Sequence, residues 1–206
     1  MTAPVTSGLT QQLAATVDAL RRVTVRVQAS GAAASGAGVL WDPGAGGGDD
    51  SRGLVITNAH VATRAQATIQ FSDGAVAQAR VVARDRRRDL AALELEVRTA
   101  AGVAQVRGAP LLRVGELVIA IGHPGELTGA ATLGIVHTAG GERAGRTPPW
   151  IRADLRLAPG FSGGPLADAG GRLIGINTLM HGGMALAVPA ALVQSWLRRA
   201  QAPAAP

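Results

Sequence analysis

The stretch PGFSGGPL, residues 159–166, places one serine among three glycines, and the rest of the chain can be arranged around it. Because glycine has no Cβ, this backbone can adopt turn conformations that are closed to other residues and can bring its N–H groups close to a bound carbonyl. Ser162 is therefore a candidate nucleophile. A Gly-rich β-turn in which the serine only caps the turn would have the same local pattern. Partners elsewhere in the chain must decide between these two interpretations.

Two upstream residues are candidate partners of this serine. His60 closes the apolar, β-rich run LVITNAH, and Asp89 opens the run DLAALEL. Nucleophilic catalysis by serine needs a base that takes the hydroxyl proton and a carboxylate that holds the base in the right tautomer. Taken singly, His60 could be a hydrogen-bonded histidine at a strand end and Asp89 a solvated acid. Taken together, in the order His60, Asp89, Ser162, they indicate a catalytic triad.

Short apolar runs separated by turn residues fill most of the chain and predict an all-β fold. No helical pattern interrupts them, which favours closed antiparallel barrels over a parallel sheet, and two barrels are the economical number. Helical spacing of apolar residues predicts a short helix near each end, over 9–20 and 189–200. The predicted strands are residues 23–28, 36–41, 54–60, 67–71, 75–83, 90–96, 117–122, 132–139, 150–154, 164–168, 172–179 and 184–189.

The predicted organisation puts the candidate triad in the cleft between the two barrels, because His60 and Asp89 fall in the first half and Ser162 in the second. The Gly-rich segments 41–53 and 139–149 are expected to be surface loops, the second of them mobile. The predicted segments are a lead-in helix in 1–22, a first barrel in 23–100, a linker in 101–110, a second barrel in 111–188, and a C-terminal helix and tail in 189–206.

Five short motifs carry a resemblance to a known family. TNAHV, DLAALEL, AIGHPG, SGGPL and GINT occur in an order and at spacings that resemble the HtrA/Deg group of trypsin-like serine proteases. The resemblance covers nearly the whole chain and implies two Greek-key antiparallel β-barrels. It covers a protease domain only, without a PDZ domain.

The resemblance also implies roles for individual residues. His60 would be the general base, Asp89 its orienting acid and Ser162 the nucleophile, and the backbone N–H groups of Gly160 and Ser162 would form the oxyanion hole. The implied substrates are unfolded proteins or peptides, no cofactor is implied, and a homo-oligomer is left open. One departure is Phe161, where the family usually has Asn, and it leaves a catalytically weak, peptide-binding pseudoprotease as the alternative function.

The pocket for the side chain before the scissile bond is expected to be lined by the segment leading to the serine and by the chain after GINT. Arg156, six residues before Ser162, resembles the pocket floor, where a preference for Arg or Lys would need an acid. If Asp154 neutralises Arg156, small or medium aliphatic side chains are preferred, whereas a free Arg156 would accept acidic ones. The remaining candidate wall residues are Phe161, Thr178, Leu179, Gly182 and Gly183.

Composition limits the other function classes. The formal charge is +6 and every basic residue is Arg, but the arginines are neither clustered on one face nor interleaved with aromatic residues, which argues against a nucleic-acid partner. His123 is expected to support a turn, and no carboxylate or cysteine is spaced for a metal near any histidine outside the candidate triad, so no metal site is predicted.

The ends of the chain and its apolar runs bear on location. The first 22 residues lack the pattern of a signal peptide, and no apolar run approaches the roughly 20 residues that span a membrane. The compartment stays open: the sequence as it stands suggests the cytoplasm, and a removed leader would place the protein outside it.

Overall fold

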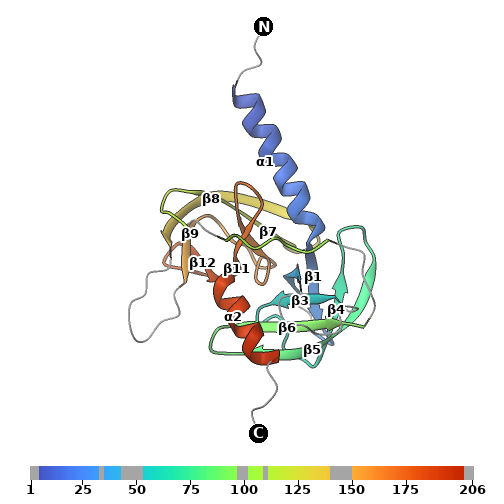
Figure 1. Ribbon diagram of the computed structural model, residues 1–206. Helices are drawn as coiled ribbons and strands as arrows, with labels where there is room; N and C mark the ends of the chain where they lie inside the picture. The colour runs from blue at the N-terminus through green and yellow to red at the C-terminus, as the bar shows by residue number, and fades with distance from the viewer. Residues whose placement is uncertain are drawn as a thin grey trace.

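The computed structural model describes residues 5–32, 35–42, 53–96, 102–108, 111–139 and 150–201. Two closed antiparallel β-barrels form the body of the molecule, and a helix projects from it near the N-terminus (Figure 1). The all-β, two-barrel prediction is confirmed. Most of the two expected surface loops, and part of the expected linker, lie outside the described residues.

The first barrel closes in the strand order β1-β2-β3-β6-β5-β4. Its interior is filled by branched aliphatic side chains, among them Val25, Val27, Ile69, Leu93 and Leu95. Because aromatic residues are only 2% of the sequence, β-branched and leucine side chains supply the volume of this core. The strands are β1 (Thr24–Ala29), β2 (Gly36–Trp41), β3 (Leu54–Thr57), β4 (Gln66–Gln70), β5 (Val76–Asp85) and β6 (Leu90–Leu95).

The second barrel repeats the connectivity of the first. Followed around the ring from its first strand, its order is β7-β8-β9-β12-β11-β10, which matches the first barrel strand for strand. The two halves therefore share one Greek-key path although no sequence repeat between them is visible. The strands are β7 (Leu117–Gly122), β8 (Ala130–Ala139), β9 (Ile151–Asp154), β10 (Pro165–Asp168), β11 (Leu173–His181) and β12 (Met184–Pro189).

A third apolar cluster joins the two barrels to the C-terminal helix α2 (Ala190–Gln201). Trp41 and Leu90 enter it from the first barrel, Ile176 from the second, and Val193 and Trp196 from α2. Burial of this shared cluster fixes how the barrels lie relative to each other. The strand ends that each barrel brings to the space between them are therefore held in place.

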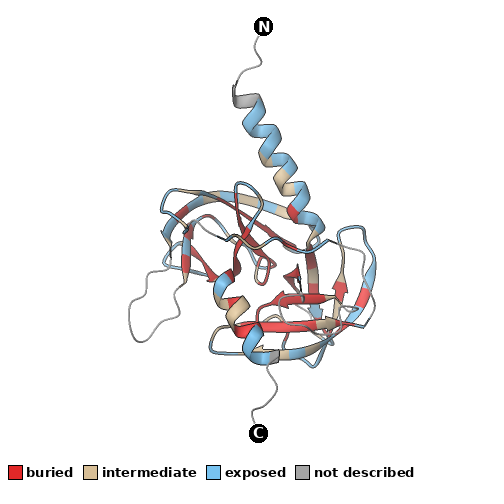
Figure 2. Ribbon diagram, viewed as in Figure 1, coloured by how far each residue is buried: buried red, intermediate tan, exposed pale blue. Residues whose placement is uncertain are grey.

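The N-terminal helix α1 (Val5–Arg22) is longer than predicted and is covered only near its C-terminal end. There Leu20 is buried against Ile119 and Ile121 of β7, with Leu13 and Val17 partly covered. Most of the helix is exposed along its length (Figure 2). No helix in the described part of the chain is long and apolar enough to cross a membrane.

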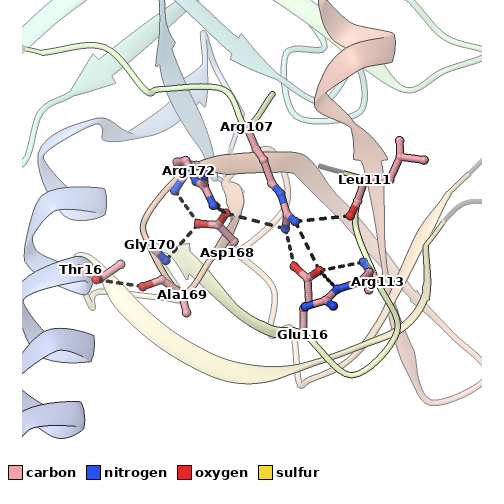
Figure 3. Close-up of polar contacts among 9 residues, drawn as sticks. All are labelled: Thr16, Arg107, Leu111, Arg113, Glu116, Asp168, Ala169, Gly170 and Arg172. Carbon is pink, nitrogen blue, oxygen red and sulfur yellow. Dashed lines mark hydrogen bonds and ion pairs between the residues drawn. The ribbon is translucent and has the colours of Figure 1, made fainter. Parts of the chain in front are cut away.

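A polar cluster on the second barrel lies where the 102–108 segment passes the start of β7 (Figure 3). The side chain of Arg107 is only 7% exposed and its Nη1 lies 2.5 Å from Glu116 Oε2 and 3.8 Å from Asp168 Oδ2. The hydrogen bonds from Arg107 hold the pKa of Glu116 at about 2 against the opposing effect of burial. Through charge-assisted contacts this network ties together three chain segments: 102–108, the residue before β7, and the end of β10.

The strand predicted over 54–60 ends earlier, at Thr57. The N–H groups of Val61 and Ala62 both donate to the carbonyl of Asn58, at 3.2 and 3.1 Å, which turns the chain out of the sheet. The β-rich sequence alone does not mark this turn. As a result, His60 stands on a turn just beyond the strand end and not within a strand.

Candidate active site

His60 and Asp89 lie beside each other because their strands are neighbours. Strands β3 and β6 are antiparallel and pair Thr57 with Ala91, so the residues just after β3 and just before β6 meet at one edge of the barrel. His60 Nδ1 lies 2.8 Å from Asp89 Oδ2, and the His60 backbone N–H donates to Oδ1 at 3.1 Å. This arrangement favours the tautomer with the proton on Nδ1, which leaves Nε2 free to accept one.

The Asp89 carboxylate has a third donor from the other barrel. The hydroxyl of Thr178 donates to Oδ2 at 2.5 Å, and the side-chain amide of Asn58 donates to the Asp89 carbonyl at 2.9 Å. Burial acts to raise the pKa of Asp89, but the hydrogen bonds from His60 and Thr178 outweigh it and hold the pKa below its usual value. Asp89 is therefore ionised at neutral pH.

Ser162 lies in a turn between β9 and β10 that backbone hydrogen bonds define. Gly163 N–H donates to the Asn177 carbonyl at 2.8 Å, and the Ala37 N–H of the first barrel donates to the Ser162 carbonyl at 2.8 Å. The Ser162 hydroxyl donates to the Thr178 carbonyl at 2.9 Å. The backbone carbonyl of Thr178 thus contacts Ser162, and its hydroxyl contacts Asp89, the partner of His60. Through these contacts the three predicted triad residues lie close together.

Gly160 and Ser162 present two backbone N–H groups without an acceptor among the described residues. Gly160 has φ +103°, and a Cβ there would stand 2.4 Å from the His123 carbonyl oxygen and 2.7 Å from Pro124 Cα. Only glycine fits this position, because a side chain would both strain the backbone and collide with the neighbouring loop. Two unpaired N–H groups, one of the serine itself and one of the glycine two residues before it, can bind a negatively charged oxygen.

Phe161 is buried in the core of the second barrel, with 5% of its surface exposed. Its ring packs over Gly122, where an added Cβ would lie 2.6 Å from Phe161 Cγ. The aromatic side chain at this position therefore anchors the serine turn to the barrel.

The other predicted pocket residues take varied positions. Arg156 is exposed, and no ion pair joins it to Asp154 in the part of the chain that the structure describes. Leu179 is 45% exposed on β11. Gly182 and Gly183 form the tight turn between β11 and β12, with φ +58° and +79°, which is the two-residue hairpin geometry that glycine favours.

His123 lies behind the oxyanion-hole candidate and is almost fully buried. Its backbone N–H donates to the Gly160 carbonyl at 2.9 Å, and its Nδ1 accepts from the Gly129 N–H at 3.2 Å. Burial, with a smaller contribution from the Arg26 guanidinium, lowers the pKa of His123 to about 4. The imidazole is therefore neutral at physiological pH and supports the turn, as its sequence context indicates.

Sequence reasoning missed the double contact of Thr178, which it took only for a pocket wall. The hydroxyl of Thr178 reaches a carboxylate 89 positions away in the chain. The GINT motif does not indicate whether the hydroxyl of its threonine forms a hydrogen bond within the site or is only a strand side chain. Among the described residues, no group of three or more His, Asp or Glu side chains could hold a metal ion.

Comparisons with known proteins place the chain in a family. The model of the trypsin-like peptidase domain matches residues 36–176. Over 152 residues, or 70% of its length, the chain is 36% identical to Serine protease HTRA1 of Xenopus tropicalis and 37% identical to Serine protease HTRA4 of Mus musculus. The aligned segment covers 33% and 32% of these relatives, so the chain spans about a third of their length. The resemblance to the HtrA group is confirmed, and the chain belongs to the trypsin-like peptidase family.

Proposed function

We propose that this protein is a serine endopeptidase that hydrolyses peptide bonds of polypeptide substrates through an acyl-enzyme. The observation that carries the proposal is the 2.8 Å contact between His60 Nδ1 and Asp89 Oδ2, together with a serine whose own backbone N–H and that of Gly160 have no acceptor among the described residues. These contacts support the roles that acyl transfer needs, with Ser162 as the nucleophile, His60 as a base held in one tautomer, and the two N–H groups as donors for an oxyanion.

In the acylation step, Ser162 Oγ leaves the Thr178 carbonyl and gives its proton to His60 Nε2 while it bonds to the carbonyl carbon of the substrate. The substrate oxygen becomes negatively charged and accepts hydrogen bonds from the N–H groups of Gly160 and Ser162. The C–N bond then breaks as the imidazolium returns the proton to the leaving amine. Asp89 stays ionised throughout and stabilises the imidazolium.

Deacylation repeats these roles with water. His60 Nε2 takes a proton from water, whose oxygen attacks the ester carbon, and the proton then passes to Ser162 Oγ as the C–O bond of the ester breaks. The products are a free carboxyl group and the regenerated serine. No group outside the chain is needed to balance the reaction.

The substrate side chain before the cleaved bond is proposed to be a small or medium aliphatic one. Arg156 carries a positive charge without an Asp154 partner in the described structure and disfavours Arg and Lys side chains. Because Arg156 is exposed, solvent screens its charge and weakens both its repulsion of basic side chains and its attraction for acidic ones, so we expect the small and apolar wall residues, such as Leu179, to set the preference. A mixed peptide library analysed by mass spectrometry tests this preference: dominant cuts after Arg or Lys would contradict it, and cuts after Asp or Glu would show that Arg156 governs the pocket.

Labelling with a fluorophosphonate tests the activity itself, because the reagent reacts only with an activated serine and needs no knowledge of the substrate. The wild-type protein is expected to be labelled on Ser162, in the presence of peptide activators if the free protein is latent. Ser162→Ala should not be labelled and should lose on the order of 10⁶ in kcat with the fold unchanged. A folded wild type that resists labelling and matches Ser162→Ala in casein cleavage would leave the peptide-binding pseudoprotease as the better description.

A further inference from the structure

The backbone of Asp89 has an unusual conformation. Its φ is +54°, and it is the one non-glycine residue with a positive φ in the part of the chain that the structure describes. Asp89 ends the four-residue connection between β5 and β6, because Asp85 and Leu90 are partners across the two strands. Glycine is the usual residue at such a left-handed position, and other residues need support from their surroundings to stay there.

Asp85, the last residue of β5, provides hydrogen bonds along the turn that leads to Asp89. Its Oδ1 accepts from the N–H groups of Arg87 and Arg88 at 2.9 and 3.0 Å, and its Oδ2 accepts from Arg88 Nη1 at 2.5 Å. Burial acts to raise the pKa of Asp85, but the contacts with Arg88 and Arg87 outweigh it and lower the pKa. The carboxylate is therefore charged at neutral pH, and its hydrogen bonds to the turn are charge-assisted.

The catalytic carboxylate tolerates little displacement. Its three hydrogen bonds, from the His60 N–H, His60 Nδ1 and the Thr178 hydroxyl, all lie between 2.5 and 3.1 Å. These donors come from a turn of the first barrel and a strand of the second, so a shift of the Asp89 backbone would break several of them together. A displacement of about 1 Å in a catalytic group can cost on the order of 10²-fold in rate.

Arg84, the residue before Asp85, contacts the loop that follows His60, the partner of Asp89. Arg84 Nη2 donates to the carbonyl of Arg64 at 2.7 Å and also to that of Ala62, in the loop that follows His60. Arg84 and Asp85 at the end of β5 thus form hydrogen bonds with both the loop after His60 and the turn before Asp89.

We propose that Asp85 is a positioning residue for the reaction, which holds the 86–89 turn so that Asp89 stays in its left-handed conformation with its carboxylate on His60. The proposal rests on the proposed function, since it requires Asp89 to act in catalysis. Asp85 touches neither substrate nor the reacting atoms, and its whole effect passes through Asp89.

A double-mutant cycle tests this route. Asp85→Ala is expected to lower kcat by about 10- to 100-fold with KM changed less than about twofold, because the turn loses three hydrogen bonds while the substrate contacts stay. In an Asp89→Asn background the same change should have almost no further effect on kcat, since the carboxylate that it positions is already gone. Equal losses in the two backgrounds would overturn the proposal.

Two further variants separate positioning from stability. Asp85→Asn keeps a side-chain oxygen for the two backbone N–H groups and should lose only about three- to tenfold in kcat. If Asp85→Ala fails to fold, Asp85→Asn takes its place in the cycle.

Asp73→Ala is the matched control, because Asp73 Oδ1 accepts from the Ala75 N–H at 2.9 Å in the β4–β5 turn of the same barrel. It should lower the melting temperature without changing kcat, and a similar loss of kcat would contradict a specific role for Asp85.

These outcomes are distinct from a failure of the proposed function. If the wild type is not labelled by a fluorophosphonate, the activity itself is absent. If the wild type is labelled and active but Asp85→Ala and Asp85→Asn keep full kcat, only the positioning proposal is wrong.

Discussion

The two barrels share one strand order but hold their parts of the site in different ways. The first barrel uses side chains: the Asn58 amide donates to the backbone carbonyl of Asp89, and the Asp89 carboxylate accepts from His60. The second uses its backbone: the Gly163 N–H donates to the Asn177 carbonyl, and the Asn177 N–H donates to the Gly164 carbonyl. We expect the first barrel to tolerate isosteric side-chain changes that remove a catalytic group and keep the fold. The second should tolerate no added atoms at the glycines of its serine turn, Gly160, Gly163 and Gly164.

Among changes that leave the Ser162 nucleophile in place, the largest effect should come from the first barrel. Asp89→Asn is expected to fold normally, because Asn is nearly the same size and also tolerates a positive φ. It should lower kcat by about 10⁴, the magnitude known for this change in chymotrypsin-type enzymes, since the amide no longer fixes the His60 tautomer. Thermal unfolding and kcat measured on one preparation check both parts.

Rapid cleavage by a folded Asp89→Asn protein would contradict the assignment of Asp89. Loss of folding in this variant would contradict the comparison, because it would show that the first barrel also depends on the site for its structure.

The second barrel should respond to a single added methyl group. Gly160→Ala places a Cβ 2.4 Å from the His123 carbonyl oxygen, so the 160–162 backbone must shift. Loss of one oxyanion donor typically costs about 10² to 10³ in kcat. The matched control is Gly74→Ala, at φ +88° in an exposed turn with nothing within 4 Å of the added Cβ, which should lose stability but keep kcat. Equal kcat in the two variants would show that the Gly160 backbone does not contribute an oxyanion donor.

The fold was largely predictable from the sequence, and the details of the site were not. Alternating and continuous apolar runs marked the strands because burial dictates that pattern. The same β-rich pattern hid the end of β3 at Thr57, since the turn there comes from hydrogen bonds to the Asn58 carbonyl and not from a Gly or Pro. The role of the Thr178 hydroxyl was missed because it depends on a contact with Asp89, and only the packing of the two barrels brings these residues together. Phe161 was predicted to line the substrate pocket, and its burial in the barrel core depends on the space that Gly122 leaves for its ring.

A pH-dependent loss of stability should appear in the second barrel. The pKa of His123 is about 4 in the folded protein, below the ordinary value of 6.5, so the unfolded chain binds the proton more tightly. Its neutral form stabilises the fold fully above pH 6.5, and this stabilisation is lost as pH falls toward 4. Between pH 7 and pH 4.5 the loss should be about 2 to 3 kcal/mol.

Urea unfolding of the wild type and of His123→Asn at both pH values measures this contribution by difference. The variant has no imidazole to protonate, so the wild type should lose about 2 to 3 kcal/mol more than the variant over this range. The range stops at the ordinary pKa of Glu116, 4.5, because the stabilisation from its lowered pKa of about 2 is lost mainly below that pH. Parallel losses in the two proteins would show that His123 is not the group that titrates.

The smallest effect is expected where the two barrels meet, at the 2.5 Å hydrogen bond from the Thr178 hydroxyl to Asp89 Oδ2. Thr178→Val keeps the shape and the backbone carbonyl that contacts Ser162 but removes one donor to a charged group. Such a bond is typically worth about 1.5 to 3 kcal/mol in place, and with the two His60 donors remaining we expect a loss of about tenfold in kcat with KM unchanged. Thr178→Ser should restore most of the activity. Thr24→Val is the matched control, since it removes a buried hydroxyl that donates to the Leu20 carbonyl at 2.7 Å in the first barrel, and it should lower stability alone. A Thr178→Val protein with wild-type kcat would show that the first barrel holds its carboxylate without help from the second.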